Sequence, residues 1–496
     1  MVTTTKNFTD VISWLKVQKK KFGHQQISTF IAAIRVANKH YKFQVLQPTT
    51  TSIMEHVLQC AEKVADMGLK ADAVVASILY SIPKFCQNWH LELLPFGQEV
   101  IDLIKGINRV DSIKKINHNL FTSNSKKNIE VVRTMLLAMA SDIRSVIIVL
   151  IGRGELMLNL NSCNNQDKII QIAQTTMSIF APLANRLGLW QIKWELEDIA
   201  FKFLHRKEYQ TIAKLLDSSR LSRLSYLQQI ENNLTQQIKK AGIKNFKLYG
   251  RAKHIYSIWN KMKNKNYSFE DLYDVLAIRV IVNTISECYA VLGITHSYYL
   301  PINKEFNDYI ATPKNNHYQS LHTCVKTDEG ISVEIQIRTK EMHENAEYGI
   351  AAHWKYKESE IDNIKFEQKI SWVRRILDLD KKDNLSSSQI SQIFKNEVFT
   401  DKIYVISPKG QVINLPAGSS VIDFAYYIHH DVGLYCQQAK VDNEVVPLST
   451  VLQNGQTVEV ICGQKPIIKL SWVYNKVAIT KKAKNAIKRY FKQLDS

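Results

Sequence analysis

The segment that begins at Gly250 gathers cationic side chains in a pattern that suits a polyphosphate. It reads GRAKHIYSIWNKMKNK, and a helix beginning near Lys253 would place Lys253, Ser257 and Lys261 on one face at four-residue spacing. The opposite face carries the apolar residues Ile255, Ile258, Trp259 and Met262. Arg251 could stack on a base or bind phosphate oxygens through its planar guanidinium. A solvated lysine face on an ordinary amphipathic helix explains the same spacing, so both interpretations stay open.

Two strand-like segments supply carboxylates. In ISVEIQIRT, alternation places Glu334, Gln336 and Arg338 on a polar face, opposite an apolar one. Asp274 opens the other segment, DVLAIRVIV. Carboxylates from neighbouring strands can hold Mg²⁺ while substrate phosphates complete its octahedron. A solvated outer face explains Glu334 equally well, and an N-terminal turn explains Asp274.

A third segment combines an aromatic ring with polar groups. It reads DYIATPKNNHYQSLHT, in which a turn over residues 312–316 precedes Tyr318, Gln319, Ser320 and His322. A tyrosine beside amide and hydroxyl groups suits stacking on a purine and recognition of its edge. A buried tyrosine with a satisfied hydroxyl is an equally good interpretation.

Familiar nucleotide and zinc motifs are missing from the sequence. No GxxxxGK[ST] segment occurs, and the GRG at residues 152–154 lacks the third glycine of a dinucleotide fingerprint. The run HENAE has Glu347 where a zinc-protease helix needs its second histidine, which excludes that site. A nucleotide site in this chain must therefore be built in another way.

The composition places these segments in a soluble multidomain protein. With 496 residues, 45% of them hydrophobic and 22% charged, the chain should form two to four globular domains. The net charge of +19 suggests a polyanionic partner such as nucleotide phosphates or RNA, although a general bias toward lysine would give the same excess. Apolar runs too short for a membrane span, and a start without a signal peptide, predict a cytoplasmic location. The seven cysteines are widely spaced and form no CxxC pair, so we expect no disulfide framework or zinc ribbon.

Hydrophobic periodicity divides the chain into three parts. From Asn7 to about Gly242 the apolar spacing predicts helices almost throughout. Residues 246–357 alternate helical and strand-like runs and include a hairpin that turns between Thr327 and Gly330. A polar, serine-rich stretch at residues 377–393 predicts a linker, and a small α+β domain and a basic C-terminal helix follow it.

In this order and spacing, GRAKHIYSIWNKM, DLYDVLAIRVIV, EFNDYIATPKNNHYQSLHT and VEIQIRTKEMHENAEYGIAAHWKYK closely resemble the synthetase domain of the RelA/SpoT homologue family. The resemblance continues through FAPLANRLGLWQIKWELEDIAFKFL upstream and FTDKIYVISPKGQVINLPAGSSVIDFAYYIHHDVG downstream, and covers roughly His56 to Lys492. It implies a multidomain α and α+β fold with an all-α HD-type domain, a nucleotidyltransferase-like mixed α/β synthetase domain and a β-grasp TGS domain. The expected bounds are 1–200 for a degenerate HD-type pseudo-hydrolase domain, 201–240 for connecting helices, 241–375 for the synthetase domain, 376–398 for a linker, 399–464 for the TGS domain and 465–496 for the start of a helical region.

The family's synthetase transfers the β,γ-pyrophosphoryl group of ATP to the ribose 3′-hydroxyl of GTP or GDP, which makes the alarmone (p)ppGpp. The resemblance assigns ATP binding to Arg251, Lys253, Ser257, Lys261 and Arg279. It assigns Mg²⁺ binding and catalysis to Asp274 and Glu334, of which Glu334 could bind Mg²⁺, accept the 3′-hydroxyl proton, or do both. It assigns the acceptor guanine nucleotide to Tyr318, with His322 and Gln336 as secondary candidates.

Two departures from the family pattern indicate a RelA-type synthetase. Bifunctional members hold Mn²⁺ in the HD domain, but only His56 of the ligand positions is kept. The other metal-site positions hold Tyr80, Ser81, Lys84, Phe85 and Gly152. One imidazole cannot hold a catalytic metal, so we expect the hydrolase to be inactive. The acidic ExDD motif of RelA-type members is matched by Glu305, Phe306, Asn307 and Asp308, where an amide replaces one carboxylate and leaves the choice between GTP and GDP open.

The C-terminal part implies an RNA partner. His429, followed by His430, matches a TGS histidine that meets the 3′ end of uncharged tRNA on the ribosome. RelA-type proteins continue beyond TGS, whereas this sequence stops at Ser496, which leaves activation by the ribosome open. We expect no DNA partner and no membrane partner. The alternative function is a catalytically weak or silent relic that binds nucleotides or tRNA.

Overall fold

A computed structural model of the protein describes residues 11–111, 142–218, 220–265, 267–269, 272, 276–302, 305–313, 318–327, 330–349, 402–408, 412–453, 456–475 and 477–494. The chain forms two compact units, residues 1–307 with 320–398 and residues 308–319 with 399–496. Asp274 and the predicted linker at 376–398 lie outside the described residues. In the described part of the chain, no helix combines the length and apolar character that crossing a membrane requires.

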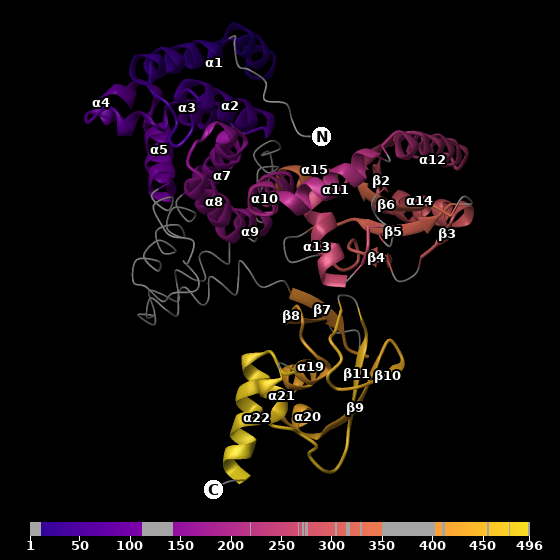
Figure 1. Ribbon diagram of the computed structural model, residues 1–496. Coiled ribbons are helices and arrows are strands. Elements are labelled where there is room, and N and C mark those ends of the chain that lie inside the picture. Colours follow the sequence, from indigo (N-terminus) through magenta and orange to yellow (C-terminus); the bar gives the residue numbers. More distant parts are fainter. Residues whose placement is uncertain are drawn as a thin grey trace. The chain divides into compact units, whose positions relative to one another are not determined.

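The first part of the larger unit is helical, as the sequence predicts (Figure 1). Its helices are α1 (Val11–Tyr41), α2 (Ile53–Asp66), α3 (Ala71–Leu79), α4 (Trp89–Leu93), α5 (Gln98–Asp111), α7 (Ile143–Leu158), α8 (Gln166–Thr175), α9 (Ala181–Arg186), α10 (Trp190–Leu204), α11 (Arg206–Ser218) and α12 (Arg220–Lys240). Between them lie the short 3₁₀ helices η1 (Ile82–Lys84), η2 (Leu94–Phe96) and η5 (Asn159–Ser162) and the π-helix η6 (Thr176–Phe180). Residues 143–157 of α7 are almost all buried, so α7 lies at the centre of this helical layer.

A buried ion-pair cluster fixes α10 to the helical layer. The ammonium of Lys63 on α2 lies 2.9 Å from Glu155 of α7 and 2.8 Å from Glu195 of α10. Since Glu155 is almost fully buried, its charge depends on Lys63 for compensation. The helix α10 is therefore held against α2 and α7.

The mixed sheet of the larger unit has the strand order β1-β2-β6-β5-β3, with β4 paired to β5 (Figure 1). Its strands are β1 (Lys247–Ala252), β2 (Leu276–Val282), β3 (Leu300–Pro301), β4 (Asn307–Asp308), β5 (Leu321–Lys326) and β6 (Ser332–Thr339). The pair β2 and β6 is parallel, and β1–β2, β5–β6 and β3–β5 are antiparallel. The β5–β6 hairpin confirms the predicted turn, where the amide of Gly330 donates to the carbonyl of Thr327 over 2.9 Å.

The two faces of this sheet differ in chemistry. The apolar face carries Ile278, Val280, Ile335 and Ile337, and α14 (Ile285–Tyr298) packs against β2, β5 and β6. At the sheet edge, a Cβ on Gly250 would lie 3.0 Å from Glu231 Oε1 and 3.4 Å from Leu227 Cδ1 of α12, so a larger residue would require these side chains to move.

The polar face is not solvated, which corrects one expectation. Gln336 is 6% exposed and Arg338 only 1% exposed. Polar groups with so little access to water need partners within the protein.

A second correction concerns the helix predicted from Lys253. Residues 247–252 belong to strand β1, and the helix α13 (Ile255–Lys265) begins two residues after Lys253. Lys253 therefore does not share a helical face with Ser257 and Lys261. The apolar stripe is confirmed, because Ile258 is fully buried in a cluster with Ile255, Trp259 and Met262 around it.

The smaller unit contains a hairpin of β7 (Lys402–Ile406) and β8 (Val412–Pro416) and a three-stranded sheet in the order β10-β9-β11. Its other elements are α19 (Val421–Ile428), α20 (His430–Tyr435), β9 (Cys436–Val441), β10 (Glu444–Val446), β11 (Val458–Cys462), α21 (Ser471–Tyr474) and α22 (Lys481–Leu494). The sequence patterns did not predict β9 and β10. The predicted basic C-terminal helix is confirmed as α22.

One buried carboxylate joins α22 to the rest of this unit. Asp423 caps α19 by accepting from the amide of Ser420, and it also accepts from the amide and hydroxyl of Thr480 at 2.9 and 2.7 Å. Ala483 and Ile487 of α22 are fully buried in the same core as the strands. The helix is therefore an integral part of the unit's packing.

Candidate active site

Strand register collects the predicted site residues on the polar face of the sheet. Residues at paired positions of neighbouring strands point to the same face. One row across β1, β2, β6 and β5 consists of Tyr249, Arg279, Gln336 and His322, and the next consists of Arg251, Ala277, Glu334 and Cys324. Four segments that are far apart in the sequence thus contribute to one surface.

Glu334 lies at the centre of this surface with both carboxylate oxygens engaged. His322 Nδ1 lies 2.8 Å from Oε1, and the amide of Gln336 donates to Oε2 over 3.0 Å. Burial alone would raise the pKa of Glu334, but His322, the nearby Lys253 ammonium and Gln336 outweigh it and lower the pKa to about 2. Glu334 is therefore an anion throughout the neutral range.

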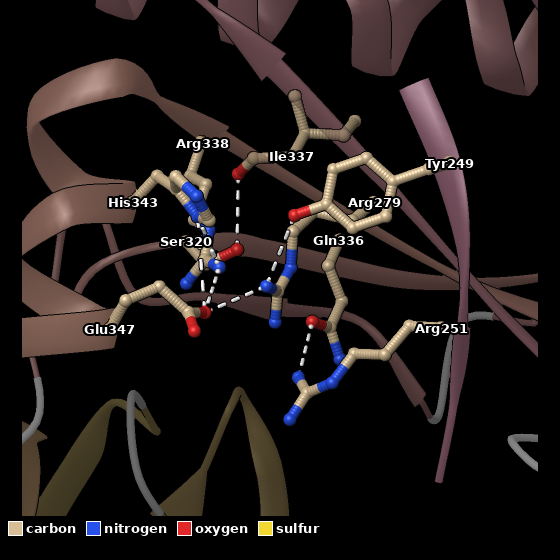
Figure 2. A network of polar contacts seen from close by, with 9 residues as sticks. All are labelled: Tyr249, Arg251, Arg279, Ser320, Gln336, Ile337, Arg338, His343 and Glu347. Atoms are coloured by element: carbon tan, nitrogen blue, oxygen red, sulfur yellow. Dashed lines mark hydrogen bonds and ion pairs between the residues drawn. The ribbon is translucent and has the colours of Figure 1, made fainter. Parts of the chain in front are cut away.

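Arg251 reaches the same place from the sheet edge. Its Nη1 donates to Gln336 Oε1 over 3.2 Å (Figure 2). The guanidinium carbon lies 3.9 Å from the ring centroid of Trp194, which belongs to α10. One face of the guanidinium thus rests on an indole, which is the stacking role that the sequence left open for a bound base.

The start of α13 is held by a residue that sequence reasoning missed. Asp198 of α10 accepts from the amide of Tyr256 over 2.8 Å and from that of Ile255 over 3.3 Å. It also pairs with His254 Nδ1 at 3.2 Å, and the His254 ring stacks on Trp194. A carboxylate at these first amides satisfies helix donors that have no partner within the helix. The element α10 therefore determines where the strand β1 passes into α13.

A buried cluster on the same face of the sheet joins two arginines to one carboxylate. Glu347 on α15 (Lys340–Tyr348) accepts from Arg279 Nη1 over 2.8 Å and from Arg338 Nη2 over 3.2 Å (Figure 2). Arg279 is 4% exposed, and its Nε and Nη2 have no hydrogen-bond partner among the described residues. Burial raises the pKa of Glu347, but the two guanidinium groups more than compensate and lower it.

His343 is part of the same cluster as a neutral acceptor. Its Nδ1 accepts from Arg338 Nη2 over 2.8 Å, as the dashed line in Figure 2 shows. Burial and the Arg338 charge lower the pKa of His343. The segment HENAE, excluded above as a zinc site, instead supplies counter-charge and hydrogen bonds to arginines.

The acidic motif contacts a cationic side chain of α13. Lys261 pairs with Glu305 at 3.0 Å, and both side chains are 16% exposed. Ser257 lies on the same helix, one turn before Lys261, and is half-buried. Asn307 is in β4. The acidic motif and the predicted ATP motif are thus in direct contact.

Contacts among its own residues stabilise the segment that begins at Asp308. Asp308 Oδ1 accepts from the amides of Ile310 and Ala311 over 2.9 and 2.8 Å, so this carboxylate closes a turn. Tyr318 is buried and meets the ring of Tyr309 edge-on at 6.1 Å. These positions belong to the smaller unit, whereas the polar face of the sheet belongs to the larger one.

The helical domain brings together three of its predicted degenerate positions. His56 Nε2 lies 2.9 Å from the hydroxyl of Tyr80, and a Cβ on Gly152 would lie 3.8 Å from His56 Nε2. Ser81 is buried next in sequence, and Lys84 is exposed. The Cys60 thiol lies 3.7 Å from His56 Nε2, so the converging side chains are an imidazole, a phenol and a thiol, with no side chain at position 152.

In the smaller unit, His429 is exposed at the start of α20. Its side chain is 65% exposed, and Nδ1 accepts from the amide of Asp431 over 3.2 Å. His430 follows as the first residue of the helix and is also exposed.

Three domain families match the chain in order. Residues 33–190 match the HD domain, residues 250–361 match the region found in RelA / SpoT proteins, and residues 403–462 match the TGS domain. The helical layer, the mixed sheet with its polar face, and the small β unit correspond to these three matches. The protein thus has an all-α HD domain, a mixed α/β synthetase-type domain and a TGS domain.

Curated relatives match most of the chain. The chain is 38% identical over 452 residues to a GTP pyrophosphokinase from Haemophilus influenzae, covering 90% of this chain and 60% of the relative. It is 41% identical over 404 residues to a GTP pyrophosphokinase from Escherichia coli strain K12, covering 80% and 54%. A Synechocystis protein named probable guanosine-3′,5′-bis(diphosphate) 3′-pyrophosphohydrolase is 40% identical over 402 residues, covering 80% and 52%. The chain contains the region found in RelA / SpoT proteins between an HD-domain match and a TGS-domain match, and it spans roughly half to three fifths of the length of these relatives.

Proposed function

We propose that the protein is a (p)ppGpp synthetase that transfers the β,γ-pyrophosphoryl group of ATP to the 3′-hydroxyl of GTP or GDP. One observation carries the proposal. The sheet register and the turn after β1 bring Arg251 and Lys253 to the same place as Glu334, His322 and Gln336. Cations that can bind a polyphosphate thus lie beside an anionic carboxylate, which is the charge arrangement that pyrophosphoryl transfer requires.

In the proposed reaction, the ribose 3′-oxygen attacks the β-phosphorus of ATP. The bond from that phosphorus to the oxygen bridging to the α-phosphate breaks, and AMP leaves. Arg251 and Lys253 stabilise charge on the transferred group, and the 3′-hydroxyl proton passes to the His322–Glu334 pair. Because its pKa is about 2, the Glu334 carboxylate is a weak base by itself. We therefore assign its hydrogen bond with His322 the role of orienting the imidazole.

The residues present suit Mg²⁺. An ionised carboxylate is a hard oxygen ligand, and Mg²⁺ binds proteins through one or two such groups together with substrate phosphates. Glu334 and Asp274 would hold the ion. When bound, Mg²⁺ neutralises charge on the phosphate oxygens.

We further propose that the HD domain has lost hydrolase activity. A catalytic Mn²⁺ needs several nitrogen and oxygen ligands, whereas the groups beside His56 are the Tyr80 hydroxyl and the Cys60 thiol, with a glycine at position 152. The proposal predicts no Mn²⁺-dependent release of pyrophosphate from ppGpp. Such a release would overturn it.

The proposed partner is RNA. The TGS match and the exposure of His429 support contact with uncharged tRNA on a ribosome. We expect His429→Ala to reduce the stimulation of synthesis by tRNA and to leave the basal rate unchanged.

A silent nucleotide-binding protein is the second candidate. It is favoured by the ion pairs that already occupy Lys261 and Arg279, which ATP phosphates would have to displace. The two candidates differ in product formation.

The test is an incubation of the purified chain with γ-labelled ATP, Mg²⁺ and either GTP or GDP, with the labelled products resolved. Labelled pppGpp or ppGpp together with AMP is the expected result. Binding of both nucleotides without any product would overturn the synthetase and favour the silent protein.

A further inference from the structure

Three potential metal ligands converge at the edge of the helical layer, away from His56. They are His40 in the last turn of α1, Cys86 just after the turn η1, and Glu92 in α4. One nitrogen, one sulfur and one oxygen atom of these side chains all lie within 4.8 Å of one another. No part of the proposed synthetase or of the former hydrolase site uses them.

The present contacts show that the three groups point at one spot. His40 Nε2 lies 2.7 Å from Glu92 Oε2, and the thiol of Cys86 donates to the same oxygen over 3.5 Å. In a tetrahedral zinc site with bonds of 2.0 to 2.3 Å, neighbouring ligand atoms are about 3.3 to 3.7 Å apart. Small side-chain movements would therefore open room for an ion between them.

The surroundings also suit a metal ion. Glu92 Oε1, the oxygen that faces away from the cluster, pairs with Lys39 at 2.7 Å, and such an outer contact orients a metal-binding carboxylate. The side chains of His40 and Glu92 are 13% and 20% exposed, so the site is largely shielded from solvent but accessible to an ion. The loop is anchored as well, because the Phe85 ring meets Tyr41 and the amide of Cys86 donates to the carbonyl of Ile82.

We propose that His40, Cys86 and Glu92 form a Zn²⁺ site with water as the fourth ligand, which ties the end of α1 to the loop before α4. Imidazole, thiolate and carboxylate are the ligands that zinc takes in proteins. Binding exchanges the thiol proton for the metal, so one proton is released to solvent. The thiolate and the carboxylate then balance the charge of Zn²⁺.

The first test uses Co²⁺ as a spectroscopic probe of the full chain under reducing conditions. The expected result is one equivalent of bound Co²⁺ that shows a thiolate charge-transfer band and the visible bands of a tetrahedral ion, all abolished by one equivalent of Zn²⁺. Cys86→Ser should remove the charge-transfer band, and His40→Asn should weaken Co²⁺ binding at least tenfold. Cys462→Ser, which alters an exposed cysteine elsewhere, should change nothing.

A second measurement covers the case in which these variants do not fold. Zn²⁺ should slow alkylation of Cys86 in the unaltered protein, followed by peptide mass analysis, without slowing alkylation of Cys462. Absence of stoichiometric Co²⁺ binding, a charge-transfer band that survives Cys86→Ser, or equal alkylation of Cys86 with and without Zn²⁺ would each overturn the site.

Discussion

The buried arginines Arg279 and Arg338 pair with the same carboxylate. Both pair with Glu347, and both are almost inaccessible to water. A buried charge that loses its partner costs about 3 to 5 kcal/mol of folding free energy. Glu347→Gln should therefore destabilise the larger unit by about that amount.

The measurement for Glu347→Gln is hydrogen exchange of β2 and β6, which reports the local stability of the sheet. Glu341→Gln, on the exposed side of the same helix, is the matched control and should have little effect. Adding Arg338→Met to Glu347→Gln should restore part of the stability, because one of the two uncompensated charges is removed. No loss in Glu347→Gln would refute the account of this cluster.

The neutral state of His343 predicts a pH dependence. Its pKa in the folded protein is lower than the ordinary value of about 6.5, so the unfolded chain binds the proton more readily. The stability contributed by His343 is complete above about pH 6.5 and is lost as the pH falls below that value. His343→Asn keeps an acceptor for Arg338 and should flatten this part of the dependence.

Thermal unfolding between pH 7 and pH 5 tests the role of His343. The melting temperature of the unaltered protein should fall more steeply than that of His343→Asn, while His90→Asn, an exposed control, should behave like the unaltered protein. Parallel curves for all three proteins would contradict the role assigned to His343.

At the residue scale, alternation along β6 correctly predicted that Glu334 and Gln336 share a face. It could not predict that this face is buried, because burial depends on the strands and on α15 that fold over it. Nor could it find Glu347, whose partner Arg279 lies 68 residues away and is joined to it only by the sheet. Cross-strand pairs of this kind have no signature in local spacing.

At the element scale, α10 joins the helical layer to the sheet. Its Glu195 pairs with Lys63 of α2, and its Trp194 and Asp198 contact β1 and α13. The helix α13 begins at Ile255 rather than at Lys253 for two reasons: the preceding residues pair with β2, and Asp198 caps the next amides. Neither reason is visible from the local sequence, which is why the predicted start was wrong.

Asp198→Ala should weaken the contact between α10 and the start of α13. Loss of a helix cap costs about 1 kcal/mol, and the shift of Lys253 and Arg251 should raise the KM for ATP by roughly tenfold. The KM for GTP should change much less, because the capped helix belongs to the predicted ATP motif. Steady-state kinetics with each nucleotide varied in turn make the comparison.

Asp167→Ala is the matched control, since Asp167 lies in the first turn of α8 and is exposed. Equal changes in both KM values of Asp198→Ala, or none in either, would contradict the positioning role of Asp198.

At the scale of the whole molecule, the sequence predicted an HD domain, a synthetase domain and a TGS domain, and family matches confirm all three. The bounds given for all the domains, for the linker and for the C-terminal region remain predictions. The strands β9 and β10 were missed because CQQAKVDNEVV has few large apolar residues, and only Cys436, Ala439 and Val441 of β9 are buried. Strands of this composition resemble loops.

The packing of α22 predicts that the smaller unit needs its last helix. Ile487 is fully buried, so Ile487→Ala should cost about 2 to 5 kcal/mol of that unit's stability. Lys488→Ala, on the exposed side, is the control. Hydrogen exchange of β9 and β11 should rise in the first variant only, and a basal synthetase rate equal to that of the unaltered protein is expected for both.

The central claim is that Glu334 is part of a pyrophosphokinase site and not only of a nucleotide-binding surface. The most direct measurement compares Glu334→Gln with the unaltered protein and with Glu341→Gln, for (p)ppGpp formation and for binding of ATP and GTP. We predict that product formation by Glu334→Gln falls by about 10²- to 10³-fold while nucleotide binding is largely kept, and that Glu341→Gln remains active. Product formation by Glu334→Gln at the rate of the unaltered protein would contradict the account.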